Sequence, residues 1–429
     1  MTMRRRVKRL RNGLRRTTNT LVAASGLPSV VDRTRFLRTR TAPEGPDATR
    51  WHVLVAPPGG GNIGDQAMVE AFLENTTGGI RIVVRTEADI TVPAEHAGRV
   101  ELHPLPSLIH GGGHQHREAI EGYRRLLSSA RSVTVVGADA MDGAYDVRAS
   151  VRRADAATLA TRLGIDARIL GFSWNGEAHP GARRALARAG RSGVLLLVRD
   201  PISAARARAD GLTGVIEVAD AVFSARTVSS QPVTEYLGAA PGPYVVVNAS
   251  GLVARSVDQV KEYARIVRSC LDAGLTVVLL PHVLRSSSSD LTACRALLER
   301  VDDPRVILIE RQLAPAEVRG VCAGARFVLA GRMHLAIQAL WSAVPAITIS
   351  TQGKVEGLMH LLGTETLCVD PTHGLADRVH PIISDVLARP DWFRTRIAGR
   401  LPAVRALADL NFQALSEKTN SPALEQETT

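Results

Sequence analysis

The stretch WHVLVAPPGGGNIGDQAMVEAFLE, residues 51–74, joins three local signals in a fixed order. A short apolar run comes first, a glycine-rich turn follows at 59–64, and a helical pattern completes the stretch. Apolar runs of this length bounded by glycine and proline indicate a buried strand, and the glycines permit a tight turn into a helix. The stretch therefore predicts the first strand–turn–helix unit of an α/β fold.

The same alternation extends along the rest of the chain. Strand-like runs recur in two series, which are GIRIVVR (79–85), SVTVVGA (132–138), ARILGF (167–172), GVLLLVRD (193–200) and GVIEVAD (214–220), then PYVVVNAS (243–250), TVVLLPH (276–282), RVILIE (305–310), ARFVLAG (325–331), PAITIS (345–350) and TLCVD (366–370). Strands that alternate with helices form parallel sheets, and twelve strands are many for one open sheet. We expect two doubly wound Rossmann-like domains that face a cleft.

A segment rich in Ser, Pro and Gly, RTVSSQPVTEYLGAAPGP, separates the two series. The predicted division is a basic tail at 1–48, an N-terminal domain at 51–225, a linker at 226–242, a C-terminal domain at 243–412 and a polar tail at 413–429. Ligands of such folds bind beyond the carboxyl ends of the strands, so functional residues are expected there.

The net charge of +11 belongs to the N-terminal tail. Twelve of the 53 Lys and Arg and one of the 42 Asp and Glu lie within residues 1–40, so the remainder of the chain is neutral. Such a tail fits either a disordered arm or attraction to an anionic membrane surface. It gives no reason to expect a specific nucleic-acid partner, and a body with 4% aromatic residues offers few stacking platforms for single strands.

Two further features limit the class of protein. No run of about 18 apolar residues occurs, so no membrane-spanning helix is expected. The four cysteines lie far apart with no CxxC pair, which disfavours a disulfide framework or a zinc ribbon and favours a cytoplasmic location.

The first glycine turn resembles a dinucleotide-binding fingerprint. Gly59, Gly61 and Gly64 satisfy G-x-G-x-x-G after a strand and before a helix, and Glu87 lies near the end of the next strand. However, Asp65 would place a negative charge beside a pyrophosphate, and no tyrosine has a lysine four residues later. A nicotinamide-dependent dehydrogenase or epimerase is therefore disfavoured. Asp65 has a second interpretation as the cap of its helix.

A second glycine turn, IHGGGHQH at 109–116, carries three histidines. Zinc requires three or four ligands held on rigid elements, whereas His110, His114 and His116 stand on one short loop with no companion carboxylate. We therefore expect no metal, and interpret this segment as a loop that lines the cleft.

The most informative stretch is ARFVLAGRMHLAIQALWSAVPAITISTQGKVEGLMHLLG, residues 325–363. Arg332 and His334 follow one predicted strand and Lys354 follows the next, so all three are expected at one edge of the C-terminal sheet. His282 and Arg199 also follow strands, one in each domain. Arginine, lysine and a helix N-terminus suit a small, multiply charged anion, and histidine adds a group that transfers protons near neutral pH.

The order of these motifs resembles that of the polysaccharide pyruvyltransferase family. The matching segments are GGGNIGDQAM (59–68), VRDPIS (198–203), VADAVF (218–223), PHV (281–283) and GRMHLAIQAL…VPAITIS…GKVEG (331–357). The resemblance implies a GT-B-like fold, and transfer of the pyruvyl group of phosphoenolpyruvate, a co-substrate, to a sugar hydroxyl of a cell-surface glycan. No further cofactor is implied.

By position, the resemblance places Arg332, His334 and Arg199 around phosphoenolpyruvate. It places Gly61, Asn62, Gly64 and Asp65 on the acceptor side. Our hypothesis from the residues gives His334 the acid–base role and assigns Arg332, Arg199, Lys354 and His282 to binding the anion. Asp65 is the candidate base for the acceptor hydroxyl.

Two other functions fit the same architecture. A GT-B-type glycosyltransferase would use a nucleotide sugar, and a non-catalytic glycan-binding protein would retain the fold without turnover. The expected partners of the transferase are phosphoenolpyruvate and a glycan or lipid-linked oligosaccharide. The basic tail would then allow peripheral association with the inner face of the plasma membrane.

Overall fold

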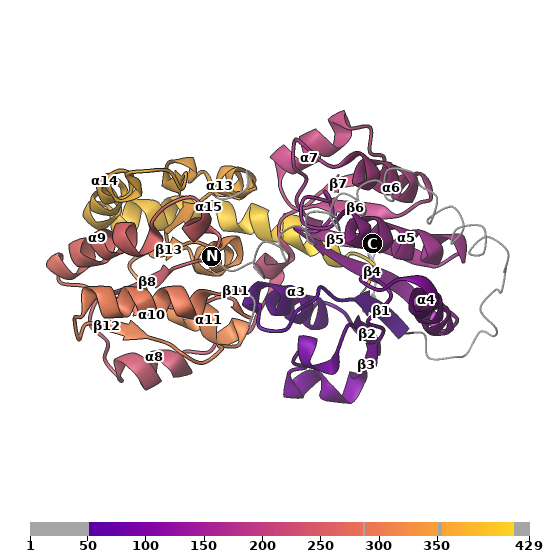
Figure 1. Cartoon of the computed structure of the whole chain (residues 1–429), viewed down its shortest axis with the longest axis horizontal. Coiled ribbons are helices and arrows are strands. Elements are labelled where there is room, and N and C mark those ends of the chain that lie inside the picture. The colour runs from indigo at the N-terminus through magenta and orange to yellow at the C-terminus, as the bar shows by residue number, and fades with distance from the viewer. Residues whose placement is uncertain (1–50, 286–287, 351–353, 416–429) are drawn as a thin grey trace, which may run out of the picture.

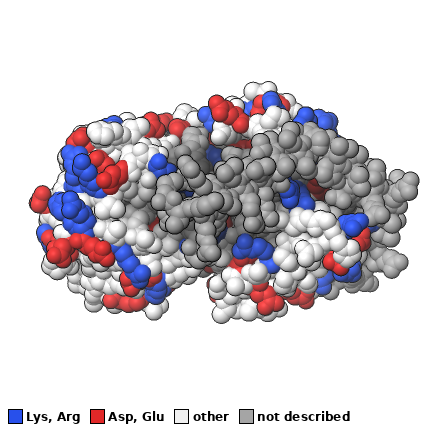
Figure 2. Space-filling model, viewed as in Figure 1, with Lys and Arg blue, Asp and Glu red and all other residues white. Residues whose placement is uncertain are grey.

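A computed structural model describes residues 51–285, 288–350 and 354–415, which form two α/β lobes (Figure 1). The predicted tail at 1–48, and residues 416–429 of the predicted polar tail, lie outside the described residues. Basic and acidic side chains are mixed over the C-terminal lobe on the face that Figure 2 shows. No helix in the described ranges is long and apolar enough to cross a membrane.

The N-terminal lobe is built on a parallel sheet. Within residues 51–225, seven strands lie in the order β3-β2-β1-β4-β5-β6-β7. The strands are β1 (Trp51–Val55), β2 (Ile80–Val84), β3 (Val100–Pro104), β4 (Ala130–Ala138), β5 (Asp166–Phe172), β6 (Leu195–Val198) and β7 (Val215–Glu217). The helices are α3 (Ile63–Glu74), α4 (Gly113–Leu127), α5 (Val147–Arg162), α6 (Pro180–Arg191) and α7 (Pro201–Ala209). Strand β3 was not predicted, because its sequence VELHP is partly exposed at the sheet edge and lacks a buried apolar run.

The C-terminal lobe repeats this plan. In its described residues, six parallel strands lie in the order β12-β9-β8-β13-β14-β15. The strands are β8 (Tyr244–Asn248), β9 (Thr276–Leu279), β12 (Val306–Leu308), β13 (Val328–Ala330), β14 (Ala346–Ile349) and β15 (Cys368–Val369), with a small hairpin of β10 (Leu284–Arg285) and β11 (Ser288–Ser289). The helices are α9 (Gln259–Asp272), α10 (Asp290–Val301), α11 (Pro315–Ala323), α12 (Met333–Leu340), α13 (Val355–Leu362), α14 (Leu375–Ala388) and α15 (Pro390–Asp409). The expected fold class of two doubly wound domains is confirmed.

Each sheet reverses its strand order once, between β1 and β4 in the N-terminal lobe and between β8 and β13 in the C-terminal lobe. The loops that leave the carboxyl ends of strands on either side of such a reversal diverge and open a crevice. The two reversal points therefore mark where a ligand site is expected in each lobe.

The segment predicted as a linker contains a short helix, α8 (Gln231–Leu237), which packs on α11. Nearby, Ser229 N donates to Ala316 O at 2.9 Å and Arg319 Nε donates to Thr227 O at 2.7 Å. These bonds attach the segment to the C-terminal lobe.

The chain crosses back to the N-terminal lobe at its described end. Helix α15 runs from the C-terminal lobe toward the other (Figure 1). After it, Asn411 Nδ2 donates to Ala219 O at 2.9 Å, and Arg168 Nη1 donates to Gln413 O at 2.8 Å. Residues 411–413 thus pack on the N-terminal lobe, although the predicted division assigned 411 and 412 to the C-terminal domain.

Candidate active site between the lobes

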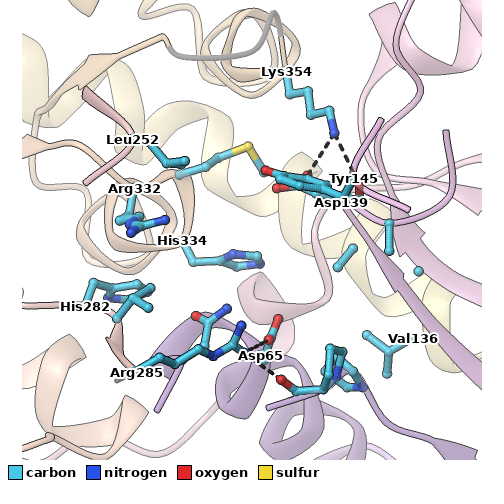
Figure 3. A pocket seen from close by; sticks show the side chains of 18 of the residues that line it. Asp65, Val136, Asp139, Tyr145, Leu252, His282, Arg285, Arg332, His334 and Lys354 are labelled. Atoms are coloured by element: carbon cyan, nitrogen blue, oxygen red, sulfur yellow. Dashed lines mark hydrogen bonds and ion pairs between the residues drawn. The ribbon is translucent and has the colours of Figure 1, made fainter. Parts of the chain in front are cut away.

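A cavity of about 420 Å³ lies between the carboxyl ends of the two sheets (Figure 3). Its volume falls within the range usual for small-molecule sites. The wall includes Asp65, Arg153 and Asp139 from the N-terminal lobe, and Arg332 and His334 from the C-terminal lobe. Residues from both predicted domains therefore share one cavity.

The first glycine turn holds the lobes together. Asn62 caps α3, its side chain accepting from Gly64 N at 3.0 Å, so the cap is not Asp65. Leu284 N donates to Gly61 O at 2.7 Å, and Ile63 N donates to His282 O at 3.2 Å. The loop after β9 is thus bound along this turn.

The glycines of this turn allow the C-terminal lobe to pack closely against it. A Cβ on Gly64 would lie 2.7 Å from the ring of His334, and a Cβ on Gly61 would lie 2.8 Å from Leu284 O. Gly61 also has φ of +77°, which favours glycine. Gly61 and Gly64 do not line the cavity, whereas Asn62 does. The other lobe fills the space beside both glycines, and their contact with substrate stays a prediction.

Asp65 stands on the first turn of α3 and faces the cavity (Figure 3). Its Oδ2 accepts from Arg285 Nη2 at 3.0 Å. Arg285 Nε also donates to Gly60 O at 2.9 Å, so one arginine of the C-terminal lobe holds both the turn and the carboxylate. Burial raises the pKa of Asp65 above the ordinary carboxyl value, although Arg285, His334 and Arg153 oppose this shift.

His334 lies near the start of α12 and points into the cavity (Figure 3). Its Nε2 is 3.5 Å from Asp220 Oδ2, which is within ion-pair distance but not in hydrogen-bond geometry. Burial opposes ionisation of Asp220, but His334 and Arg199 outweigh it and lower the pKa of Asp220 to about 2. A fixed negative charge therefore lies beside the imidazole.

Arg199 lies behind the cavity and does not line it. Its guanidinium is fully buried, donating to Asp220 at 2.9 Å, to Ser173 Oγ at 2.8 Å and to Asp139. Contact of Arg199 with the substrate anion stays a prediction, while Asp220 and Asp139 already accept hydrogen bonds from its Nη1 and Nη2. The guanidinium thereby orients both carboxylates.

Arg332 and His282 line the cavity on the C-terminal side (Figure 3). Asp290, which is fully buried, accepts from Arg332 Nη2 at 2.7 Å and from Nε at 3.2 Å. Neither ring nitrogen of His282 has a hydrogen-bond partner among the described residues. Burial, reinforced by the positive charges of His334 and Arg332, lowers the pKa of His282 well below its ordinary value, so its ring is neutral at pH 7.

Lys354 enters the cavity from the N-terminus of α13. Its Nζ lies 3.1 Å from Asp142 Oδ2, 3.3 Å from Asp139 O and 5.4 Å from the ring centre of Tyr145. The three predicted groups Arg332, His334 and Lys354 therefore share one cavity, but each lies beside a carboxylate. The sequence predicted that the three groups lie together but gave no information on these carboxylate neighbours.

The three histidines of the second glycine turn separate. His110 lines the cavity, His116 bonds through Nδ1 to Ser107 O at 2.8 Å, and exposed His114 pairs with Glu118 at 3.3 Å. Within the described ranges, no group of three or more His, Cys, Asp or Glu side chains is arranged to hold a metal ion. The loop interpretation holds for His110 alone, since α4 begins at Gly113.

Sequence reasoning missed Arg153, Arg285 and Asp290. Arg153 had a detectable signal, because it stands four residues from both Ala149 and Ala157 on the buried stripe of an amphipathic helix. Asp290 resembled an ordinary acidic residue at a helix start, and Arg285 belongs to a short hairpin with no periodic pattern. Their roles depend on contacts with distant segments.

Comparison with solved structures supports the fold. The chain is similar to S. aureus MnaA in complex with UDP, with 10% identity, 85% of this chain and 94% of that chain covered, and a TM-score of 0.58. It is also similar to Anabaena HepE with UDP and glucose (12% identity, 85% and 98% covered, TM-score 0.53). A third similar structure is Phytolacca americana UGT2 with UDP-2-fluoro-glucose and pterostilbene (12% identity, 84% of this chain and 95% of that chain covered, TM-score 0.51). At these identities the likeness extends to the GT-B-like fold alone.

The family is shown by a different comparison. The model of the polysaccharide pyruvyl transferase family matches residues 62–353, well over half of the chain. The matched range includes the Asn62–Asp65 turn, Arg199, His282 and the Arg332–His334 segment. The chain therefore belongs to the polysaccharide pyruvyl transferase family.

Proposed function

We propose that this protein transfers the pyruvyl group of phosphoenolpyruvate to a sugar hydroxyl of a cell-surface glycan, releasing phosphate and closing a cyclic ketal. The observation that carries the proposal is the convergence of Arg332, His334 and Lys354 with Asp65 on one cavity. Anion-binding groups and a proton donor thus face a candidate base from the opposite lobe.

The donor is assigned to the C-terminal side. Asp290 holds Nε and Nη2 of Arg332, which leaves Nη1 without a partner among the described residues. His282 offers a neutral ring with one donor and one acceptor. Together with the ammonium of Lys354, these groups suit the carboxylate and phosphate of phosphoenolpyruvate.

In the proposed reaction, protonated His334 gives its proton to the methylene carbon of phosphoenolpyruvate, and the adjacent carbon becomes electrophilic. The ionised carboxylate of Asp220, 3.5 Å from Nε2, stabilises the imidazolium before transfer. A sugar hydroxyl then attacks that carbon while Asp65 accepts its proton. The bond between this carbon and the phosphate oxygen breaks, and phosphate leaves with the electron pair and takes up the proton held by Asp65. A second hydroxyl then attacks the same carbon to close the ketal, and its proton returns to the neutral imidazole of His334.

The test supplies phosphoenolpyruvate with candidate acceptors, and follows phosphate release together with the mass of the sugar. The expected result is phosphate release that depends on an acceptor and a sugar that gains one pyruvyl ketal. His334→Gln removes the proton donor and is expected to lower kcat by about 10²–10⁴-fold. The matched control is His360→Gln, since His360 is an exposed histidine of α13 that pairs with Glu365.

Each alternative has its own outcome. Turnover of a nucleotide sugar without phosphoenolpyruvate would replace this proposal with a glycosyltransferase. Glycan binding with no turnover of either donor would leave a non-catalytic binding protein. Full activity of His334→Gln would remove His334 from the mechanism while leaving the reaction itself intact.

A further inference from the structure

Arg153 is a buried cation on the cavity wall that the proposed reaction leaves unused. It stands on α5, is 2% exposed, and lines both the interlobe cavity and a smaller adjoining one. Its Nη1 reaches Ala56 O and Val136 O, each at 3.4 Å. These carbonyls belong to the ends of β1 and β4, so Arg153 occupies the strand-order reversal of the N-terminal sheet.

The charge of Arg153 has no direct counterpart among the residues that the structure describes. No carboxylate in the described ranges lies within 4.0 Å of its guanidinium, and its buried Nε has no hydrogen-bond partner there. Asp65 attracts it from further away, but the carboxylate of Asp65 is bonded to Arg285. Burial lowers the pKa of Arg153 to about 10, which still leaves the group charged at pH 7.

Three other cations of this region differ in this respect, because each has a carboxylate partner. Arg332 is paired with Asp290, Lys354 with Asp142, and Arg199 with Asp220. Arg255 also lines the cavity, but it is exposed and therefore solvated by water. A buried charge without a partner is costly in a protein, so its presence on a cavity wall indicates that a ligand supplies the missing anion.

We propose that Arg153 binds an anionic oxygen group of the sugar acceptor, a carboxylate or a phosphate. This assignment rests on the proposed function, in which Asp65 receives the acceptor's proton. Arg153 belongs to the same lobe as Asp65, opposite the groups assigned to phosphoenolpyruvate. The acceptor is thus an acidic saccharide, and a neutral sugar leaves the guanidinium unpaired.

His110 extends this subsite. It lines the same two cavities as Arg153, together with Pro57 and Pro58. Burial and the charge of Arg153 lower the pKa of His110, so the ring is neutral and offers one donor and one acceptor without adding charge. A guanidinium beside a neutral imidazole and an apolar proline wall suits one charged group on an otherwise hydroxylated ring.

The experiment measures binding directly, by calorimetry on the full chain, with methyl glucuronide, glucose 1-phosphate and methyl glucoside as probes. Wild-type protein is expected to bind at least one acidic probe more tightly than the neutral one. Arg153→Gln is expected to lower the affinity for that acidic probe by roughly tenfold or more and to leave the affinity for the neutral probe unchanged. Preference for the uronate or the sugar phosphate identifies which anion the site takes.

Arg153→Lys keeps the charge and is expected to restore part of the preference for acidic probes. Arg162→Gln, an exposed position at the end of α5, is the matched control and is expected to behave as wild type. Phosphoenolpyruvate binding to Arg153→Gln provides a separate readout and should be unchanged. If Arg153→Gln does not fold, the proposal is tested by the ratio of acidic-probe affinity to neutral-probe affinity, measured in wild type and in Arg153→Lys.

Three results would overturn the assignment. They are equal binding of acidic and neutral sugars by wild type, an unchanged preference in Arg153→Gln, and a loss of phosphoenolpyruvate binding in that variant as large as the loss of sugar binding. A wild type that binds acidic sugar but not phosphoenolpyruvate would instead contradict the proposed function while leaving the anion subsite standing.

Discussion

The acidic and basic side chains of the cavity are held in place by partners from distant segments. Asp65 is bonded to Arg285, Arg332 to Asp290, and Lys354 lies beside Asp142. Arg285, Arg332 and Lys354 each have a carboxylate partner, so the electrostatic field at the substrate depends on which of their donors stay open as well as on the number of cations. Residue types at strand ends predicted which side chains line the cavity. They could not predict which carboxylate pairs with each cation, because the partners lie in distant segments.

The pH dependence of turnover follows from Asp65. A base must be ionised to accept a proton, and burial raises the pKa of this carboxyl. Activity is therefore expected to fall as pH decreases through that raised pKa, at a higher pH than an ordinary aspartate would give. Arg285→Gln removes a charge that opposes the shift, so its acidic limb should move further toward neutral pH.

The measurement is kcat/KM against pH for both proteins, with folding checked at each pH by circular dichroism. Asp65→Asn is the companion variant and should lose turnover at every pH. An acidic limb that does not move in Arg285→Gln would show that another group controls it.

At the scale of elements, the start of α3 determines how closely the lobes approach. The sequence predicted a strand, glycine turn and helix here, and the glycines were interpreted as room for a ligand. In the structure the room is taken by His334 and by the backbone of Leu284. This difference could not be predicted from a single lobe, because a tight turn has the same sequence whether it faces a substrate or another domain.

Gly64→Ala tests this close approach. The added methyl would lie 2.7 Å from the His334 ring, which must then move. A displacement of this kind is expected to lower kcat by about 10²-fold. The matched control is Gly399→Ala in α15, where a methyl meets nothing within 4 Å and helix propensity favours alanine by up to about 1 kcal/mol. Unchanged kcat in Gly64→Ala would show that the imidazole needs no fixed position.

Glu70, also on α3, makes stability depend on pH. Burial raises its pKa from 4.5 to about 7 although Gln66 donates to it at 2.9 Å. The folded state therefore favours the protonated form, and the free energy of unfolding is expected to fall as pH rises from 4.5 to 7. Glu70→Gln removes this loss. The free energy of unfolding of the variant, relative to that of wild type, should therefore increase by on the order of 3 kcal/mol from pH 4.5 to pH 7.

Urea denaturation at both pH values measures that gain. Glu299→Gln, at an exposed position on α10, is the matched surface control. A constant difference between Glu70→Gln and wild type at the two pH values would contradict the raised pKa.

At the scale of the whole molecule, the two lobes share one apolar core. Buried side chains on the α3 face of the N-terminal sheet, such as Leu54 and Phe72, belong to the same contiguous cluster as Leu335 and Ile347 of the C-terminal lobe. The sequence predicted both sheets and the crevice, since apolar runs are local signals. The shared core and the crossing of α15 were not predicted, because they depend on how two completed lobes pack.

The return of the chain after α15 is expected to couple unfolding of the lobes. Phe412 is 5% exposed and packs against Phe72 of α3 with ring centres 6.4 Å apart, and Ser224 donates to Asp409 at 2.6 Å. Phe412→Ala removes the aromatic contact and is expected to lower the free energy of unfolding by about 3–5 kcal/mol. Because the contact joins the lobes, the two lobes of the variant should unfold in separate transitions.

Tryptophans report on both lobes, with Trp51 and Trp174 in the N-terminal lobe and Trp341 and Trp392 in the C-terminal lobe. Denaturation followed by fluorescence of single-tryptophan variants should give coincident transitions in an otherwise wild-type chain and separate ones once Phe412→Ala is added. Leu410→Ala changes a partly exposed neighbour and should leave the transitions together. Coincident transitions in Phe412→Ala would mean that the remaining apolar core, rather than the returning segment, holds the cavity walls at their working distance.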